Sequence, residues 1–263
     1  MQSLTPPIIV FGMHRSGTSV LTRILQELGV YIGQELNDKY ENLLFKDINI
    51  HWLQRASAHW ARPEPFLHDL ATYPHRIPEL ADIAAQYLND DWRDDEPVRA
   101  HRLWGWKDPR NTLTLPIWLQ LFPEATLIHC VRDGVDVALS LQRRELRRLF
   151  KNSDVPTMLP PLIPRGYALW KTYVRQGFEI EQRYPRTLRI RYEDMMHDPK
   201  REIDKLLRLL AIENPPHADA IIQAILHQPT PRQPYEDMLV TVCTRLGLIH
   251  TGDVDIVSRD MCL

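Results

Sequence analysis

A short glycine-containing stretch near the start of the chain limits its possible folds more than any other feature. Residues 12–19 read Gly-Met-His-Arg-Ser-Gly-Thr-Ser and directly follow the apolar run Ile8-Ile9-Val10-Phe11. Their spacing is that of a phosphate-binding loop, G-x-x-x-x-G-x-[ST], which lies between a strand and a helix. The backbone N–H groups of such a loop point inward, and the following helix presents the positive end of its dipole. The stretch therefore predicts a strand, an anion site and a helix, in that order.

The loop departs from that of an ATPase at one position. The lysine expected after the second glycine is Thr18, and the basic residue is instead Arg15, inside the loop. A cation at Arg15 would contact the group being transferred or its leaving oxygen, rather than bridge a β- and a γ-phosphate. The loop alone thus favours a phosphate-ester donor other than Mg-ATP.

A second segment points to a second phosphate. The apolar run 127–131 is typical of a buried strand, and it leads into a turn and a helix. Arg132 lies at the carboxyl end of that strand, where α/β sheets bind ligands. Ser140 follows eight residues later, two helical turns along. Two phosphate sites on one nucleotide indicate 3′-phosphoadenosine 5′-phosphosulfate (PAPS) rather than ATP.

At these residues the chain resembles the PAPS-dependent sulfotransferases. Residues 14–19 are similar to their 5′-phosphosulfate loop, and residues 132–140 are similar to their 3′-phosphate site. Trp106-Lys107-Asp108-Pro109 resembles a K-D-P motif of the tyrosylprotein sulfotransferases. The stretch 191–203 resembles one in the cytosolic sulfotransferases, where the tyrosine contacts the adenine. The loop itself is most similar to that of bacterial members with a His-Arg-Ser-Gly-Thr-Ser sequence.

The resemblance assigns roles along much of the chain. The four motifs occur in family order within residues 8–36 and 103–210, which would carry the nucleotide. The stretches 40–100, 145–165 and 212–263 carry no matching motif and are expected to bind the acceptor. Arg15 and Lys107 are the expected catalytic cations, which contact the transferred group or the leaving phosphate. The expected nucleotide-binding residues are His14, Arg15, Ser16, Gly17, Thr18, Ser19, Arg132, Ser140 and Tyr192.

The general base is the least determined part of the site. Cytosolic sulfotransferases have a catalytic histidine two residues after the lysine that matches Lys107, and Pro109 stands there in this chain. Other branches use a glutamate soon after the first helix, and Glu35 lies nearest to that place. Burial would have to raise the pKa of this carboxyl for it to accept a hydroxyl proton. Further candidates remain open: Glu41, Asp47 and His51. His14, one of eleven histidines, is the weaker catalytic candidate.

The alternation of apolar runs with amphipathic segments predicts an α/β fold, a three-layer P-loop-like parallel sheet flanked by helices. Strands are expected at 8–11, 103–106, 126–131 and 187–190, with a short one at 30–32. Helices are expected at 18–28, 41–58, 78–88, 115–122, 135–148, 165–183 and 199–210. Proline-rich segments at 59–76 and 152–164 predict irregular loops. Because no linker separates the motifs, we expect one domain over residues 1–263.

The composition limits the classes of binding partner and the compartment expected for this protein. A net charge of −2 gives no basic field for nucleic acid or membranes. Three cysteines without metal spacing suit a reducing compartment. The sequence contains neither an 18-residue apolar run nor a leader, so we expect either a cytoplasmic protein without a membrane anchor, which we favour, or a trimmed form of a longer chain. Sulfuryl transfer needs no metal in principle, and none is expected.

The sequence therefore favours a sulfotransferase that moves a sulfuryl group from PAPS to a hydroxyl, with a glycan or a small metabolite as the preferred acceptor. Two alternatives stay open. One is a P-loop kinase or NTPase, which the missing post-glycine lysine opposes. The other is a nucleotide-binding protein that kept the cofactor pocket without catalysis.

Overall fold

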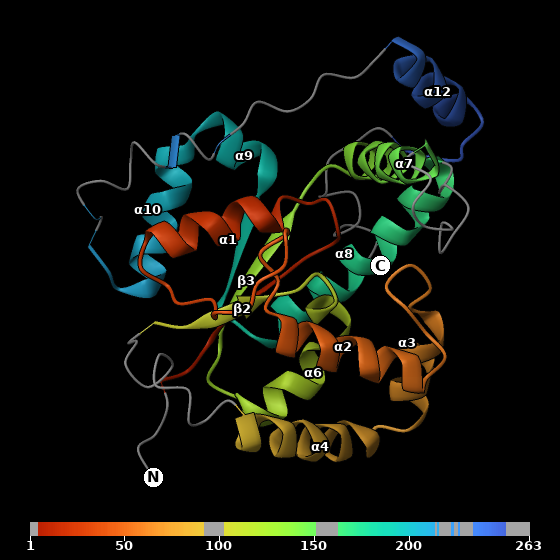
Figure 1. Ribbon diagram of the computed structural model, residues 1–263. Coiled ribbons are helices and arrows are strands. Elements are labelled where there is room, and N and C mark those ends of the chain that lie inside the picture. The colour runs from red at the N-terminus through yellow and green to blue at the C-terminus, as the bar shows by residue number, and fades with distance from the viewer. Residues whose placement is uncertain are drawn as a thin grey trace.

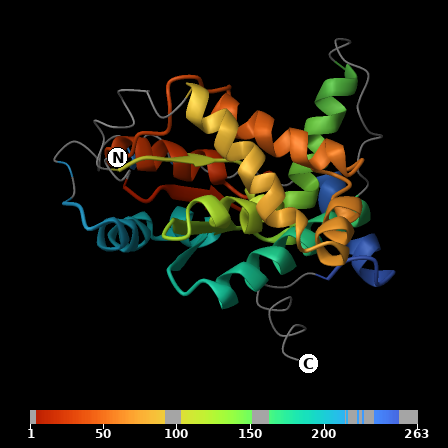
Figure 2. The same ribbon diagram turned by 90° about the horizontal axis from the view of Figure 1, so that it is seen from below.

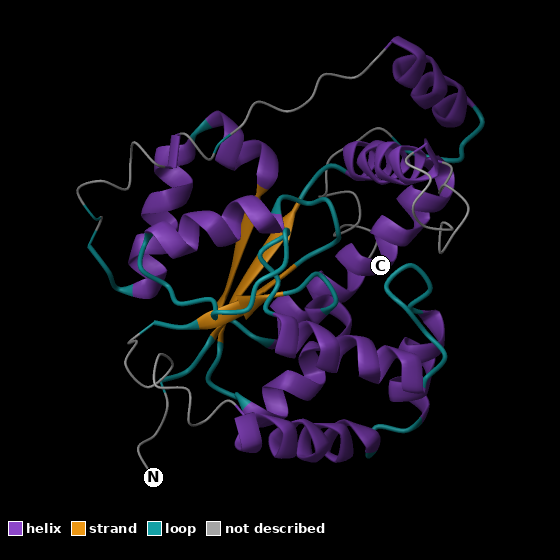
Figure 3. Cartoon of the chain, viewed as in Figure 1, coloured by secondary structure: helices purple, strands orange, loops and turns teal. Residues whose placement is uncertain are grey.

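The fold is built on a four-stranded parallel sheet, shown in Figures 1 and 3. The computed structural model describes residues 5–91, 103–150, 163–213, 215, 222–223, 226 and 234–250. The strand order is β2-β1-β3-β4, and the strands are β1 Ile8–Phe11, β2 Gly105–Lys107, β3 Thr126–Val131 and β4 Thr187–Arg191. The first strand thus lies inside the sheet, and the glycine-containing loop leaves its carboxyl end. The α/β prediction is confirmed.

Helices cover both faces of the sheet, as Figures 1 and 2 show. The helices are α1 Thr18–Glu27, α2 Leu43–Arg55, α3 Glu64–Thr72, α4 Arg76–Asp91, α6 Asn111–Leu121, α7 Gly134–Phe150, α8 Ile163–Arg183, α9 Tyr192–His197, α10 Pro199–Leu210 and α12 Pro234–Arg245. Within the described ranges, no helix is long and apolar enough to cross a membrane.

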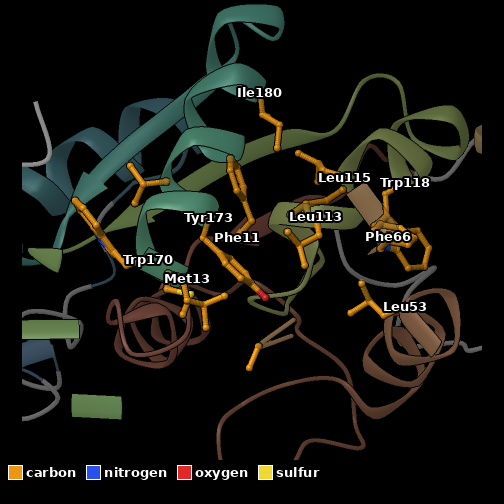
Figure 4. Packing of buried hydrophobic residues seen from close by; sticks show 14 of the residues in the cluster. Phe11, Met13, Leu53, Phe66, Leu113, Leu115, Trp118, Trp170, Tyr173 and Ile180 are labelled. Atoms are coloured by element: carbon orange, nitrogen blue, oxygen red, sulfur yellow. The ribbon is translucent and has the colours of Figure 1, made fainter. Parts of the chain in front are cut away.

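Alternate residues of the strands build two hydrophobic clusters. Val10, Ile128 and Cys130 pack with α1 and α10 on one face. Ile9 and Phe11 face the larger cluster, to which α2, α6 and α8 contribute. Figure 4 shows part of this second cluster, where Phe11, Tyr173, Leu113 and Trp118 are labelled. Because successive side chains of a strand point to opposite faces, one apolar run supplies both layers of the core.

The segment 59–76 is not the irregular loop that its prolines predict. Helix α3 occupies Glu64–Thr72 and buries Phe66 and Leu70, which are four residues apart on one helical face. Pro63 is the N-cap and Pro65 stands in the first turn. The missing N–H of proline costs no hydrogen bond at these positions, so the prolines start the helix rather than prevent it.

Other elements also differ from the prediction. Helix α6 begins at Asn111 and contains Pro116 in its interior, so the predicted start near residue 115 was late. The strand expected at 30–32 is reduced to an isolated bridge between Tyr31 and Trp104. Helix α9 was not predicted at all. The loop predicted at 152–164 lies largely outside the described residues, which resume at Ile163 with α8. The assignment of one domain to the whole chain stays a prediction.

Candidate functional site

The loop of residues 12–19, called the glycine loop below, approaches its neighbours too closely for side chains at its two glycines. A Cβ on Gly12 would lie 2.1 Å from the carbonyl oxygen of Cys130, and one on Gly17 would lie 2.4 Å from the ring of Tyr192. Both glycines have positive φ, and so does Arg15, at 73°. A non-glycine residue in this region is strained and is found disproportionately at functional sites.

The glycine loop ends at the start of α1 with polar groups left over. Gly17 is the N-cap of α1 and offers no side-chain hydrogen bond to the first-turn N–H groups. The hydroxyl of Ser16 is buried without a partner among the described residues. Cys130 does not contribute here chemically, because burial raises the pKa of its thiol to about 12. A helix N-terminus with uncapped N–H groups and a positive dipole end is suited to bind an anion.

Four predicted nucleotide-binding residues meet beside this loop. Arg15 donates from Nε to Ser140 Oγ of α7 at 2.9 Å. Arg132, at the end of β3, donates from Nη1 to the carbonyl oxygen of Arg15 at 3.3 Å. Its guanidinium carbon lies 4.3 Å from the ring centroid of Tyr192, the first residue of α9. Arg132 Nε is buried without a hydrogen bond within the described ranges. The two segments read from the sequence as separate phosphate sites are therefore adjacent.

Lys107 approaches the glycine loop from the end of β2. Its ammonium donates to the carbonyl oxygen of Lys39 at 2.6 Å, to Ser19 Oγ at 3.4 Å and to Glu41 Oε1 at 3.4 Å. The side chain is 1% exposed, and burial lowers the pKa of Lys107. Burial alone would raise the pKa of Glu41, but the Lys107 charge and a hydrogen bond from Asn37 lower it. Lys107 and Glu41 form a buried ion pair at the site.

The carboxylates considered as general base lie in different surroundings. Glu35 is exposed, and its backbone carbonyl accepts from the N–H of Leu43. Asp47 is 69% exposed and pairs with Lys46 at 3.1 Å. Glu41 contacts Lys107. The structure therefore brings Glu41, and neither of the other two, to the predicted catalytic lysine. The catalytic role of Glu35 stays a prediction.

A buried polar network that the sequence analysis missed supports the glycine loop and the Lys107 segment together. Asn49 of α2 donates to Asp108 Oδ2 at 3.0 Å and to Asn111 Oδ1 at 2.9 Å. Asn111 donates to the carbonyl oxygen of Val10 at 3.0 Å, and Thr112 Oγ1 accepts from the N–H of Gly12 at 2.9 Å. The available signal was the polar Asn111-Thr112 pair, one residue after the K-D-P motif and before the apolar Leu113.

A basic side chain completes this region. Arg110 Nη1 donates to Asp108 Oδ1 at 2.8 Å, and its own backbone N–H donates to the same oxygen at 2.9 Å. Asp108 is thus held by Arg110 and by Asn49 at once. In the part of the chain that the structure describes, no group of three or more His, Cys, Asp or Glu side chains is placed to hold a metal ion.

Comparisons with known proteins agree with this geometry. The model of the sulfotransferase family matches residues 6–216. The crystal structure of sulfotransferase STF9 from Mycobacterium avium superposes with a TM-score of 0.51 at 18% identity, over 93% of this chain and 76% of that one. The sulfotransferase domain of the olefin synthase from Synechococcus PCC 7002 gives a TM-score of 0.51 at 20% identity, over 93% and 97% of the two chains.

At such identities the two structures establish a shared fold, and no curated protein sequence matches the chain significantly. The family match spans the glycine loop, the Lys107 segment, the Arg132 segment and Tyr192, in the order that the sequence predicts. The chain belongs to the sulfotransferase family.

Proposed function

We propose that this protein transfers a sulfuryl group from PAPS to a hydroxyl group of an acceptor. The observation that carries the proposal is the hydrogen bond between Arg15 and Ser140. It joins the loop expected to bind the 5′-phosphosulfate to the helix expected to bind the 3′-phosphate. Two anion sites in contact suit a nucleotide phosphorylated on both sides of its ribose, whereas ATP carries its phosphates in a single chain.

The residues present fit such a donor. The uncapped start of α1 and the hydroxyl of Ser16, which has no partner in the part of the chain that the structure describes, would receive the 5′ group. The Nε of Arg132, likewise without a partner among those residues, and the hydroxyl of Ser140 would receive the 3′-phosphate. Tyr192 packs against Gly17 and Arg132, at the place proposed for the adenine. Buried donors without partners cost free energy, and a ligand that accepts their hydrogen bonds removes that cost.

The chemistry of the bound donor is in-line displacement at sulfur, in which the 5′-phosphate of 3′-phosphoadenosine 5′-phosphate (PAP) leaves. Arg15 and Lys107 would stabilise negative charge on the leaving oxygen, since both are basic side chains at the glycine loop. Ser19 and Thr18, in the first turn of α1, would orient the same group. Glu41 would hold the Lys107 ammonium in place through their ion pair.

The alternatives rank lower. A kinase or NTPase is not favoured, because the family match is to sulfotransferases and Thr18 replaces the post-glycine lysine. The acceptor is proposed to be a glycan or a small metabolite, without nucleic acid or membrane as partner, in the cytoplasm. These assignments rest on the family resemblance and on the charge balance.

Calorimetric titration with PAP, ADP and ATP, each with and without Mg²⁺, tests the donor. We expect PAP to bind independently of Mg²⁺ and at least about tenfold more tightly than ADP, since the 3′-phosphate adds charge-assisted hydrogen bonds. A preference for Mg-ATP, or indifference to the 3′-phosphate, would contradict the proposal.

Turnover separates an enzyme from a protein that only binds nucleotide. PAPS is incubated with a panel of sugars and phenols, and PAP release is measured for the wild type and for Arg15→Ala. Tight PAP binding with no PAP release above the buffer rate would favour the non-catalytic alternative.

A further inference from the structure

His14, in the middle of the glycine loop, has an unusual environment for a buried histidine. The residue is 9% exposed, and its Nε2 has no hydrogen-bond partner among the described residues. Its ring centroid lies 4.6 Å from that of Trp60 and 6.3 Å from that of Tyr173. The hydroxyl of Tyr173 donates its proton to the carbonyl oxygen of Trp60 at 2.8 Å, so it does not donate to His14. A buried nitrogen without a hydrogen bond costs folding free energy. At a functional site it indicates that a group of the ligand forms the missing hydrogen bond.

Cations surround this imidazole. The pKa of His14 lies well below its ordinary value, because of burial first and then because of the charges of Arg110, Arg144, Lys107 and Lys39. These four residues belong to the start of α6, to α7, to β2 and to the loop before α2. Tyr173 faces the ring from α8 and carries no charge. The imidazole is therefore neutral at physiological pH. Among the cations near it is Lys107, which is proposed to act on the transferred group.

The carboxylate beside Lys107 is poorly suited to take a proton. Glu41 accepts hydrogen bonds from Lys107 and from Asn37, which stabilise its ionised form. A base works best when its lone pair is available and its protonated form is accessible near the working pH. The lone pair of His14 Nε2 accepts no hydrogen bond from the described residues, whereas the carboxylate of Glu41 already accepts two and is stabilised in its ionised form.

We propose that Nε2 of His14 accepts the proton of the acceptor hydroxyl, an inference that rests on the proposed function. The acceptor oxygen forms a bond to sulfur as the bond from sulfur to the 5′-phosphate oxygen breaks. The electron pair of that bond goes to the phosphate, and the hydroxyl proton goes to Nε2 and then to solvent. The imidazole must carry its resting proton on Nδ1.

The surrounding cations oppose an imidazolium, but two effects offset them. The leaving phosphate gains a negative charge beside Arg15 and Lys107 during the same step. The hydroxyl also becomes far more acidic as its oxygen bonds to sulfur, so a weak base suffices late in the transfer. His14 thus supplies the basic imidazole that cytosolic sulfotransferases have at the position of Pro109.

Nitrogen-15 NMR of histidine-labelled protein tests the resting state directly. His14 is assigned from the signal missing in His14→Asn. We expect a neutral ring with unprotonated Nε2 at about pH 7, and a change at that nitrogen when PAPS is added, but not when ADP is added. An imidazolium, or a proton on Nε2 in the resting protein, would overturn the proposal.

Kinetics test the role. PAP release from PAPS, with water and with 4-nitrophenol as acceptors, is compared for His14→Asn, Glu41→Gln and Glu35→Gln. We expect His14→Asn to lower kcat by about 10²–10⁴-fold, the usual contribution of a general base, while PAP affinity changes less than about threefold. The wild-type kcat should fall with decreasing pH, and His14→Asn should lose this dependence. His59→Asn, at an exposed position next to Trp60, is the matched control.

The two hypotheses fail in different ways. If the proposed function is wrong, the wild type does not bind PAP in preference to ADP. If only the role of His14 is wrong, PAP binds and His14→Asn keeps its turnover, or a carboxylate variant alone loses it. Should neither acceptor react, the tautomer and the PAPS response of His14 still decide.

Discussion

Lys107 and Arg132, two cations of the candidate site, are held in opposite ways. The ammonium of Lys107 is buried and has three oxygen acceptors, one of them the carboxylate of Glu41. Arg132 rests on the ring of Tyr192, donates to a backbone oxygen and lies 3.8 Å from Asp136, and among the described residues its buried Nε has no hydrogen-bond partner. Lys107 is therefore positioned before any ligand binds, whereas Arg132 keeps hydrogen-bonding capacity for one. The contrast suits a cation that acts on a reacting group and a cation that grips a nucleotide.

Replacing Lys107 should have the largest effect, because it damages both stability and chemistry. We expect Lys107→Met to lower the free energy of unfolding by about 3–5 kcal/mol, since Glu41 is left as a buried unpaired charge. PAPS turnover should fall by about 10²–10³-fold. Urea unfolding and PAP release measure the two effects. Adding Glu41→Gln to the variant should restore part of the stability without restoring turnover, and recovery of both would contradict the assigned role.

Replacing Arg132 should affect binding far more than stability. We expect Arg132→Met to weaken PAP affinity by about 10- to 100-fold, which corresponds to about 1.5–3 kcal/mol for hydrogen bonds to a charged group. The unfolding free energy should change by less than about 1 kcal/mol, because the ion pair of Arg132 with Asp136 is long, at 3.8 Å, and partly exposed to solvent. Calorimetry with PAP measures the change in affinity, and urea unfolding measures the change in stability. A larger loss of stability than in Lys107→Met would reverse the comparison.

The ion pair of Glu41 should appear in the pH dependence of stability. The pKa of Glu41 is lowered in the folded protein, so the unfolded chain binds more protons below its ordinary pKa of 4.5. The stabilisation is complete above that pH and is lost as the pH falls through the folded pKa. The stability difference between wild type and Glu41→Gln should therefore shrink on acidification from about pH 6 to about pH 3. A constant difference would show that the pair contributes nothing through charge.

The smallest effect is expected for an arginine outside the site. Arg186 is 73% exposed and pairs at 2.7 Å with Glu124, which is 67% exposed. Exposed pairs are screened by solvent, so Arg186→Ala should change the unfolding free energy by less than about 0.5 kcal/mol and leave PAP affinity unchanged. A PAP affinity loss comparable to that of Arg132→Met would show that overall charge, rather than the local site, governs binding.

The meeting of Arg15, Ser140, Arg132 and Tyr192 at one place was predictable because these residues belong to short motifs at strand ends. The loop 12–19 and the Arg132 segment each combine an apolar strand, a turn and a helix within a few residues, and parallel strands place such turns at one edge of the sheet. Three of the four strands were predicted almost to the residue for the same reason.

The ion pair of Lys107, the network around Asn49 and the surroundings of His14 were not predictable, because they depend on contacts between distant parts of the chain. Glu41 meets Lys107 across 66 positions, and Asn49 meets Asp108 across 59. No local pattern distinguishes buried Glu41 from exposed Glu35, since both lie in the same polar stretch. The surroundings of His14, whose Nε2 has no partner within the described ranges, likewise include the distant residues Trp60 and Tyr173. Helix α3 was missed because prolines at a helix start and prolines in a loop look alike in sequence.

The buried network around Asn49 couples helix α2 to the strand ends that carry the candidate site. Asn49 lies in a stretch without family motifs, yet through Asp108 and Asn111 it is hydrogen-bonded to the Lys107 segment and to the strand before the glycine loop. A graft that replaced α2 by the corresponding helix of a relative would therefore disturb the candidate site unless it kept an amide at this position. Any redesign of the exposed surface of α2 should accordingly leave Asn49 unchanged.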